Sequence, residues 1–315
     1  MVKLTERYTL ENLKKVFEQP GYIAWEIQRL LFDYRFGGEA VDVMAEDWDN
    51  LVLLDACRYD YFKSQHQMLG ELTPIISHGG QSWEFMQGNF VGKKFHDTVY
   101  VTANPHTGKL DEDVFHAVEP LYIDAWSEKH ETVLPDAVTE AALDAHARYP
   151  NKRIVVHFMQ PHRPYLGDTA AEIQREHDTH GFNRNLAHND ETPDGTSFST
   201  LVENGNIPIQ KTRTAYRETL NIVLDSVNKF LEQISGKSVV SADHGELLGE
   251  KILPFTTPKF GHSHQYLRNK TLYQVPWLEI PADNRRNITS DEPVGFDRDD
   301  STVVTDRLKA LGYKN

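Results

Sequence analysis

Three apolar segments of the sequence lead directly into acidic or histidine side chains. The residues concerned are Asp55 after NLVLL, His157 and His162 in RIVVHFMQPH, and Asp243, His244 and Glu246 in KSVVSADHGE. In open parallel sheets, ligands bind beyond the carboxyl ends of the strands. If the three apolar segments are neighbouring strands, their polar ends are where we expect the chemistry to take place.

Asp243 and His244 form the most informative pair. A carboxylate oxygen and an imidazole nitrogen suit Zn²⁺, Mn²⁺ or a related divalent cation, and Asp55 from a neighbouring strand could supply a third ligand. Adjacent Asp and His also occur as ordinary turn residues, and Asp55 by itself could cap the next helix. The residue types alone leave both interpretations open.

The pattern around these residues predicts an α/β fold. From Asn50 onward, short apolar runs alternate with helical segments, which is typical of a mostly parallel sheet with helices on both faces. Expected strands are NLVLLD, DTVYVTAN, RIVVHFMQ, KSVVSAD and VPWLEI. Helices are expected in DAVTEAALDAHARY, with Asp136 as the N-cap, and in TAYRETLNIVLDSVNKFLEQI, which Gly236 ends.

Two regions lie outside this regular pattern. Residues 1–45 are expected to form a helical segment that packs on the α/β domain of residues 46–315. Its apolar stripe is interpreted as a packing face, with a membrane-surface or partner-binding helix as the alternative, and consists of Ile23, Ile27, Leu30, Leu31 and Tyr34. The polar, weakly periodic stretch 167–208 is too long for an ordinary connection and predicts an insertion near a site.

Composition excludes several classes of protein. A formal net charge of -14 argues against a nucleic-acid partner, because phosphate backbones are bound by clustered Lys and Arg. Cys57 is the only cysteine, which excludes an intrachain disulfide and agrees with a reducing compartment. The sequence contains neither a signal-peptide core nor the roughly 20 apolar residues of a membrane span. We therefore expect a cytoplasmic location and no integral membrane segment, with no prediction of oligomeric state.

Three blocks of the sequence resemble sulfatases of the alkaline phosphatase superfamily. SADHGELLGE followed by GHSHQYLRNKTLYQVPWLEI is similar to the late metal-binding block of that family. VVHFMQPHRPY resembles its Pro-His-x-Pro segment, LLDACRYDYF resembles its first metal strand, and the blocks occur in the family's order. Sulfatase-like proteins of archaeal type are especially similar. The resemblance implies an alkaline phosphatase-like fold.

Two departures from the sulfatase pattern change what the resemblance implies. Sulfatases usually open with a double Asp, whereas Asp55 is followed by Ala56. Cys57 lies in ACRYDYF and not in a Cys-x-Pro-x-Arg type motif, so a formylglycine sulfatase is not expected. The reduced ligand set is similar to that of the lipoteichoic acid synthases and phosphoglycerol transferases, in which an acid, a hydroxyl nucleophile and an Asp-His pair surround one cation.

That similarity implies a hydroxyl nucleophile after the first strand, at the start of a helix. In IISHGGQSWEFMQGNF, Ser82 follows a Gly79-Gly80 turn and opens SWEFM. Backbone N–H groups at this position would face an anionic substrate. We interpret Ser82 as the nucleophile and as a metal ligand. It could instead be only an N-cap, and Ser77 is a weaker candidate.

The remaining roles also follow from the resemblance. His162 is expected to be catalytic and to contact substrate, His262 to contact substrate, and Lys270 or Arg163 to neutralise substrate charge. Asp55, Ser82, Asp243 and His244 would hold one divalent cation, namely Mn²⁺, Zn²⁺, Mg²⁺ or Ca²⁺. A second cation, with His162, His262 and His264 as partial ligands, is a further option. His157 and His264 are weaker candidates for substrate contacts.

The resemblance implies a metal-dependent hydrolase or transferase that uses a serine nucleophile and a covalent phospho-enzyme intermediate. Its substrate would be a phosphorylated or, less favoured, a sulfated small molecule or glycan. The alternative is a catalytically inactive sulfatase-like protein that binds or scaffolds. A nucleotide-binding ATPase is disfavoured, because GNFVGKKF lacks the Walker spacing.

Overall fold

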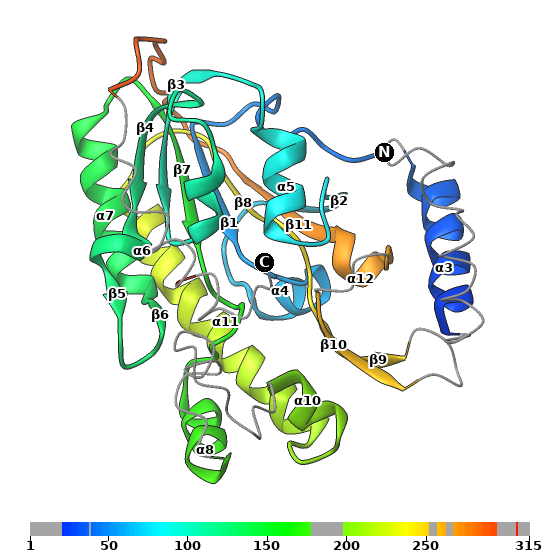
Figure 1. The fold of residues 1–315 in the computed structure, drawn as a ribbon. Helices are drawn as coiled ribbons and strands as arrows, with labels where there is room; N and C mark the ends of the chain where they lie inside the picture. The colour runs from blue at the N-terminus through cyan, green and yellow to red at the C-terminus, as the bar shows by residue number, and fades with distance from the viewer. Residues whose placement is uncertain are drawn as a thin grey trace.

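The computed structural model describes residues 21–37, 39–177, 198–251, 257–262, 267–294 and 307. Within these residues, seven strands form one sheet in the order β2-β11-β8-β1-β7-β3-β4 (Figure 1). The strands are β1 (Asn50–Leu54), β2 (Glu71–Ile76), β3 (Phe95–Thr102), β4 (Phe115–Pro120), β7 (Arg153–Phe158), β8 (Ser238–Ala242) and β11 (Gln274–Ile280). β11 is antiparallel to β2 and β8, whereas β8, β1, β7, β3 and β4 are parallel to one another. The predicted mostly parallel sheet is confirmed.

Two short hairpins and ten helices surround the sheet in the described residues. The hairpin strands are β5 (Trp126–Ser127) with β6 (Thr132–Val133), and β9 (Leu247–Lys251) with β10 (Pro258–Gly261). The helices are α3 (Gly21–Phe36), α4 (Tyr59–Gln65), α5 (Ser82–Asn89), the 3₁₀-helix η1 (Pro105–Lys109), α6 (Leu121–Asp124), α7 (Pro135–Arg148), α8 (Asp168–His177), α10 (Phe198–Glu203), α11 (Ile209–Leu231) and α12 (Lys270–Tyr273).

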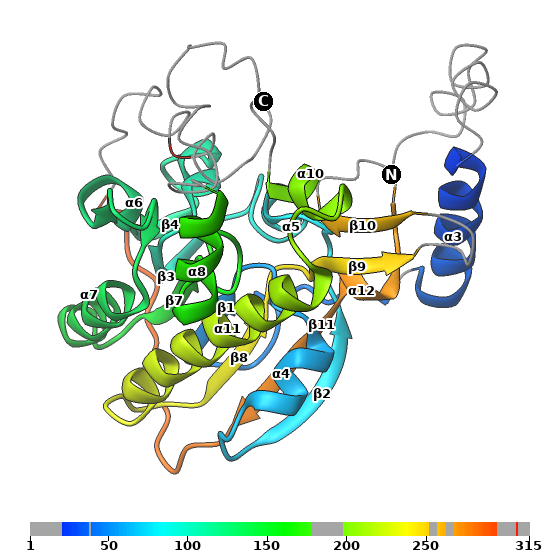
Figure 2. The same ribbon diagram turned by 90° about the horizontal axis from the view of Figure 1, so that it is seen from below.

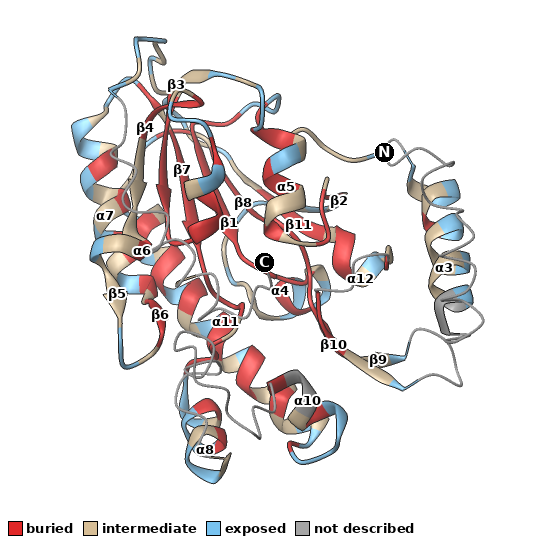
Figure 3. Ribbon diagram, viewed as in Figure 1, coloured by how far each residue is buried: buried red, intermediate tan, exposed pale blue. Residues whose placement is uncertain are grey.

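Helices cover both faces of the sheet, as the sequence predicts. Successive side chains of a strand point to opposite faces. On β1, Val52 and Leu54 belong to the core cluster that includes residues of α4, α7 and α11, whereas Leu51 and Leu53 pack in the cluster that includes residues of α5. Figure 3 shows the central strands buried between these layers. Burial on both faces explains why β1, β7 and β8 read as nearly continuous apolar runs.

The register of the central strands brings two acidic residues side by side. Leu54 of β1 pairs with Phe158 of β7 on one side and with Ala242 of β8 on the other. The next residues along β1 and β8 are Asp55 and Asp243, and both are fully buried. Parallel pairing therefore places two carboxylates at the same edge of the sheet.

The long helix α11 spans 23 residues and packs on the sheet beside α4 and α7 (Figure 2). It ends at Leu231, with Glu232 as its C-cap, so it stops before the predicted Gly236. For α7 the prediction of Asp136 as N-cap is wrong. Leu134 occupies that position, and the Asp136 carboxylate accepts hydrogen bonds from Ser226 and Lys229 of α11.

The predicted stripe of α3 does not face the core. Its five residues are between 48% and 92% exposed: Ile23, Ile27, Leu30, Leu31 and Tyr34. The helix contacts the core through Phe32, whose ring lies 5.2 Å from that of Tyr273. The prediction that the stripe packs is therefore wrong, because the helical period finds apolar faces but does not decide which face meets the core.

The insertion predicted at residues 167–208 lies partly outside the described residues. Its described parts include α8 and α10, and Phe198 of α10 packs edge-on against Tyr165 at a ring distance of 5.7 Å. Among the described helices, none combines the length and the apolar character needed to span a bilayer.

We predict that Phe230→Ala lowers the free energy of unfolding by about 3–5 kcal/mol. The Phe230 side chain, on α11, is fully buried in the core, and its truncation would leave a cavity. The measurement is urea denaturation. Leu69→Ala is the control, since Leu69 is 89% exposed and its truncation should change stability by less than about 0.5 kcal/mol. Equal effects of the two substitutions would contradict the described packing.

Candidate active site

Asp55 leaves β1 through a turn that gives its carboxylate several partners. Ala56 has a φ of 58°, in the left-handed region that non-glycine residues rarely adopt, and its N–H donates to Asp243 Oδ1 at 3.1 Å. The Tyr216 hydroxyl donates to the Ala56 carbonyl at 2.8 Å. On the carboxylate itself, Oδ2 accepts hydrogen bonds from Ser82 Oγ and Asn104 Nδ2. Through the Ala56 N–H, the turn after β1 is hydrogen-bonded to Asp243 at the end of β8.

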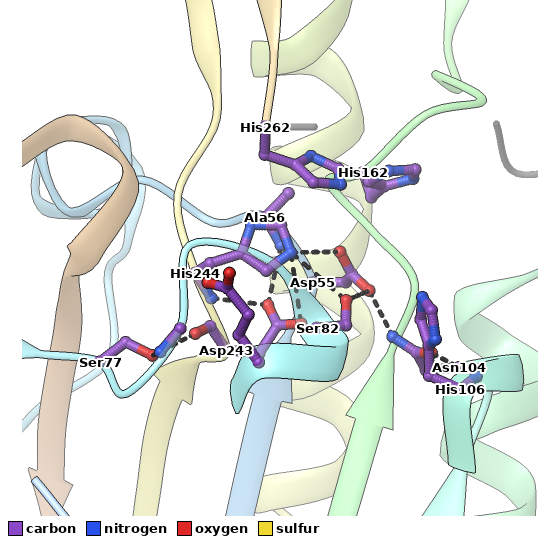
Figure 4. A network of polar contacts seen from close by, with 12 residues as sticks. Asp55, Ala56, Ser77, Ser82, Asn104, His106, His162, Asp243, His244 and His262 are labelled. Carbon is purple, nitrogen blue, oxygen red and sulfur yellow. Dashed lines mark hydrogen bonds and ion pairs between the residues drawn. The ribbon is translucent and has the colours of Figure 1, made fainter. Parts of the chain in front are cut away.

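The His244 ring is oriented with Nε2 toward the two carboxylates (Figure 4). Its Nδ1 lies 2.8 Å from the Gly245 carbonyl, which can only accept, so Nδ1 carries the proton. In the neutral ring, Nε2 then presents a lone pair, 3.5 Å from Asp55 Oδ1 and 3.5 Å from Asp243 Oδ2. A backbone carbonyl that holds the far nitrogen is the usual way to orient a metal-binding histidine.

Ser82 is the first residue of α5, and Gln81 is the N-cap. The N-cap interpretation of Ser82 is therefore wrong. The Ser82 hydroxyl is fully buried, donates to Asp55 Oδ2 at 3.1 Å and lies 3.3 Å from His244 Nε2. Ser77, the weaker candidate, donates its hydroxyl to the Asp243 backbone carbonyl and so holds that turn in place.

The donor set fits a divalent cation. Asp55, Asp243 and His244 each offer a ligand atom within 4.8 Å of the others, and all three residues are buried. Asp55 Oδ1 and Asp243 Oδ2 are buried and accept no hydrogen bond from the described residues. Burial and the Asp243 charge raise the pKa of Asp55 well above its usual range. A cation would satisfy both oxygens and offset the repulsion between the carboxylates.

A second buried cluster lies next to the first and consists of His162, Glu246 and His262. His262 Nδ1 lies 2.9 Å from Glu246 Oε2, and the His262 ring centroid is 4.4 Å from that of His244 and 5.1 Å from that of His162. Burial, followed by the neighbouring His262, lowers the pKa of His162 well below its usual range. The sequence presented Glu246 two residues after His244, but the predicted site did not include it.

The other predicted residues are placed less centrally. Arg163 follows His162, with its guanidinium 5.9 Å from the Phe198 ring. Lys270 is exposed at the start of α12, and no described contact joins it to either cluster. His264 lies outside the described residues. The roles assigned to Arg163 and Lys270 stay predictions.

The reasoning from sequence missed Asn104 and gave His157 only a weaker role, as a candidate for substrate contacts. Asn104 follows β3 and donates to Asp55 Oδ2 at 2.7 Å, and its position after the run DTVYVTA is the signal that could have identified it. His157 lies on β7, with Nδ1 2.7 Å from the Tyr100 hydroxyl and Nε2 3.7 Å from Asp243 Oδ2. Burial lowers the pKa of His157 to about 4, so the ring is neutral near pH 7. His157 therefore contacts Tyr100 and Asp243, and its predicted contact with substrate stays a prediction.

Comparison with known proteins gives structural likeness only. No model of a known protein family matches the sequence, and no curated protein matches it either. Among solved structures, the chain is similar to the C-terminal periplasmic domain of EcEptC from Escherichia coli in complex with Zn, with 12% identity, a TM-score of 0.44, and coverage of 77% of this chain and 75% of that one.

Two further solved structures are similar at the same level. Phosphonate monoester hydrolase SpPMH from Silicibacter pomeroyi shares 11% identity, with a TM-score of 0.45 and coverage of 84% of this chain and 73% of that one. A protein of the alkaline phosphatase superfamily from Vibrio parahaemolyticus shares 12% identity, with a TM-score of 0.40 and coverage of 77% and 62%. Likenesses of this extent assign no activity to the chain.

We predict that Asp243→Asn lowers the metal content of the purified protein at least tenfold, because the amide removes a ligand charge while a hydrogen-bond acceptor remains for Ala56. Mass spectrometry of metals, after dialysis against each divalent cation, is the measurement. Asp60→Asn is the control, since that carboxylate pairs with Arg58 outside the cluster. Unchanged metal content in Asp243→Asn would remove this residue from the ligand set.

Proposed function

We propose that the chain is a metal-dependent enzyme that acts on phosphate esters, with Ser82 as the nucleophile. The observation that carries this proposal is a fully buried serine hydroxyl, 3.1 Å from Asp55 Oδ2 and 3.3 Å from His244 Nε2, beside two carboxylate oxygens that no described residue satisfies. Ser82 would accept the phosphoryl group from the ester, and water or an alcohol would then remove it.

Asp55, Asp243 and His244 are the residues that would hold the cation, with Ser82 beside them. When bound there, a divalent cation would lower the pKa of a coordinated hydroxyl and neutralise charge on an ester oxygen. Asn104 and the Ala56 N–H keep the two carboxylates in place by hydrogen bonds. The protein's part is to keep these ligands oriented before substrate arrives.

Ser82 itself is oriented by two elements. Its hydroxyl donates to Asp55, which directs the proton toward that carboxylate and leaves the oxygen lone pairs for the substrate. Its position at the start of α5 places it in the first helical turn, where backbone N–H groups and the helix dipole favour an anionic substrate. A phosphoryl group at Ser82 would therefore meet hydrogen-bond donors as well as the cation that Asp55, Asp243 and His244 would hold.

The second cluster is suited to the leaving group. Glu246 accepts from His262 Nδ1, which fixes the ring and directs Nε2 away from Glu246. His262 would give a proton to the departing oxygen, and His162 would contact the substrate oxygens. A plain serine with no formylglycine motif favours phosphate over sulfate as the substrate ester.

We predict that Ser82→Ala reduces turnover of p-nitrophenyl phosphate or bis-p-nitrophenyl phosphate at least 1,000-fold, a loss of about 4 kcal/mol of transition-state stabilisation. The metal content should stay within a factor of about two, because Asp55, Asp243 and His244 remain. Steady-state kinetics and metal analysis are the measurements, with p-nitrophenyl sulfate as the comparison substrate. Ser127→Ala, in β5, is the control and should keep full activity.

Full activity in Ser82→Ala would end the nucleophile assignment. If the wild-type chain binds the metal yet turns over none of the three esters, the proposed enzyme is wrong, and the inactive binding protein replaces it.

We predict that His262→Gln slows esters with poor leaving groups more than esters with good ones, because a poor leaving group needs protonation. The measurement compares phenyl phosphate with p-nitrophenyl phosphate, and the ratio of their kcat/KM values should fall at least tenfold. His146→Gln on α7 is the control, since that side chain contacts only the Ser235 carbonyl among the hydrogen bonds described for it. An equal loss for both esters would assign His262 to binding instead of protonation.

A further inference from the structure

A polar cavity of the structure shares no lining residue with the metal-ligand cluster. It has a volume of about 230 Å³ and is formed by residues of α4, α11 and β9 together with Arg58. Three arginines and two acids line it, and none of the candidate metal ligands does: Arg58, Arg213, Arg217, Asp60 and Glu250. Three guanidinium groups against two carboxylates leave one positive charge in excess, in a chain whose formal net charge is -14.

Both acids of the cavity pair with Arg58, and Glu250 also lies 3.6 Å from Arg213. The Asp60 carboxylate accepts two hydrogen bonds from this guanidinium, at 2.9 and 2.7 Å, and Glu250 accepts one at 2.6 Å. The Arg58 side chain is only 9% exposed and also donates to the Glu246 carbonyl at 3.3 Å. Arg58 is thus a neutralised structural group that shapes the wall of the cavity.

Arg213 and Arg217 retain donors for a ligand. They lie four residues apart on α11, so their side chains share one helical face. Arg213 uses Nε on the Leu248 carbonyl at 2.8 Å, and one of its terminal nitrogens lies 3.6 Å from Glu250. Arg217 lies with its guanidinium 5.3 Å from the Tyr61 ring, and among the described residues no carboxylate is within ion-pair distance of it.

Tyr61 indicates that the three guanidinium groups converge. Arg58 and Arg217 both lie over its ring, at 4.9 and 5.3 Å from the centroid. Burial raises the pKa of Tyr61, and the positive charges of Arg58, Arg213 and Arg217 oppose that rise. Because Asp60 and Glu250 neutralise Arg58, a negative charge placed in the cavity beside Tyr61 would be attracted mainly by Arg213 and Arg217.

We propose that this cavity binds a tetrahedral oxyanion, either inorganic phosphate or the phosphate group of a larger ligand, between Arg213 and Arg217. A guanidinium fork binds two oxygens at once, and a phosphate has enough oxygens to bridge two forks. A carboxylate saturates a single fork and leaves the second arginine unused. Because a phosphate can contact the remaining donors of Arg213 and the Arg217 fork at once, the two arginines favour phosphate over carboxylate.

The cavity lies close to the catalytic residues along the chain. Arg58 is three residues after Asp55, and Glu250 is four residues after Glu246. Arg58 donates to the Glu246 carbonyl, while the Glu246 side chain contacts His262. The oxyanion site contains no residue of either cluster. It can therefore be tested independently of the proposed enzyme activity.

The experiment is equilibrium dialysis of the full chain with radiolabelled orthophosphate, after removal of metal and in an Asp243→Asn background that disables the catalytic cluster. We expect one phosphate per chain. Arg217→Gln should weaken binding about tenfold, because it removes charge-assisted hydrogen bonds. Arg148→Gln is the matched control, since Arg148 is a surface arginine that pairs with Glu119 and Asp144, and its substitution should leave binding unchanged.

Arg217 is preferred to Arg213 for the test, because Arg213 also donates to the Leu248 carbonyl and its loss could loosen β9. Circular dichroism checks that Arg217→Gln is folded. Acetate should compete at least tenfold less well than phosphate. Glycerol phosphate that binds more tightly than orthophosphate would identify a larger phosphorylated ligand, and equal or weaker binding would identify inorganic phosphate.

The proposal is overturned by any of three results. These are the absence of saturable phosphate binding, equal affinity in Arg217→Gln and the control, or competition by acetate as strong as that by phosphate.

Discussion

The site depends on two carboxylates held next to each other in a dry environment. Asp55 and Asp243 follow the last paired residues of adjacent parallel strands, and both are fully buried. Two neighbouring negative charges repel each other, and burial removes the water that would screen that repulsion. The neighbouring groups offset this repulsion, because each supplies a hydrogen bond to a carboxylate or a further ligand for a cation.

Surrounding residues satisfy one oxygen of each carboxylate and leave the other open. Asp55 Oδ2 receives hydrogen bonds from Ser82 and Asn104, and Asp243 Oδ1 receives them from the N–H groups of Ala56 and His244. The remaining oxygens, with His244 Nε2, point to one place. A protein that needed only a stable core would place apolar side chains here, since a buried pair of acids stabilises poorly.

Much of the frame could be predicted from sequence because it rests on local pattern. β1, β7 and β8 are continuous apolar runs because both of their faces are covered. A short apolar run of this kind can be recognised in the sequence. β2 and β4 were not predicted, because ELTPII and FHAVEP carry weaker strand signals and gain their place from pairing with β11 and β3. Asn104 was overlooked, and Glu246 was noted after its apolar run but left out of the predicted site, since the role of each depends on a partner elsewhere in the chain.

Residue types and their order along the chain were enough to indicate the mostly parallel sheet and to single out Asp55, Asp243 and His244, whereas Ser82 was singled out through the resemblance to a known family. They could not decide which face of α3 meets the core, that Gln81 and not Ser82 caps α5, or that Arg213 and Arg217 face a cavity beside Tyr61. Periodicity depends on neighbours within a few residues, whereas these outcomes depend on contacts between distant segments. Only the packed chain, in which register and burial are set together, determines them.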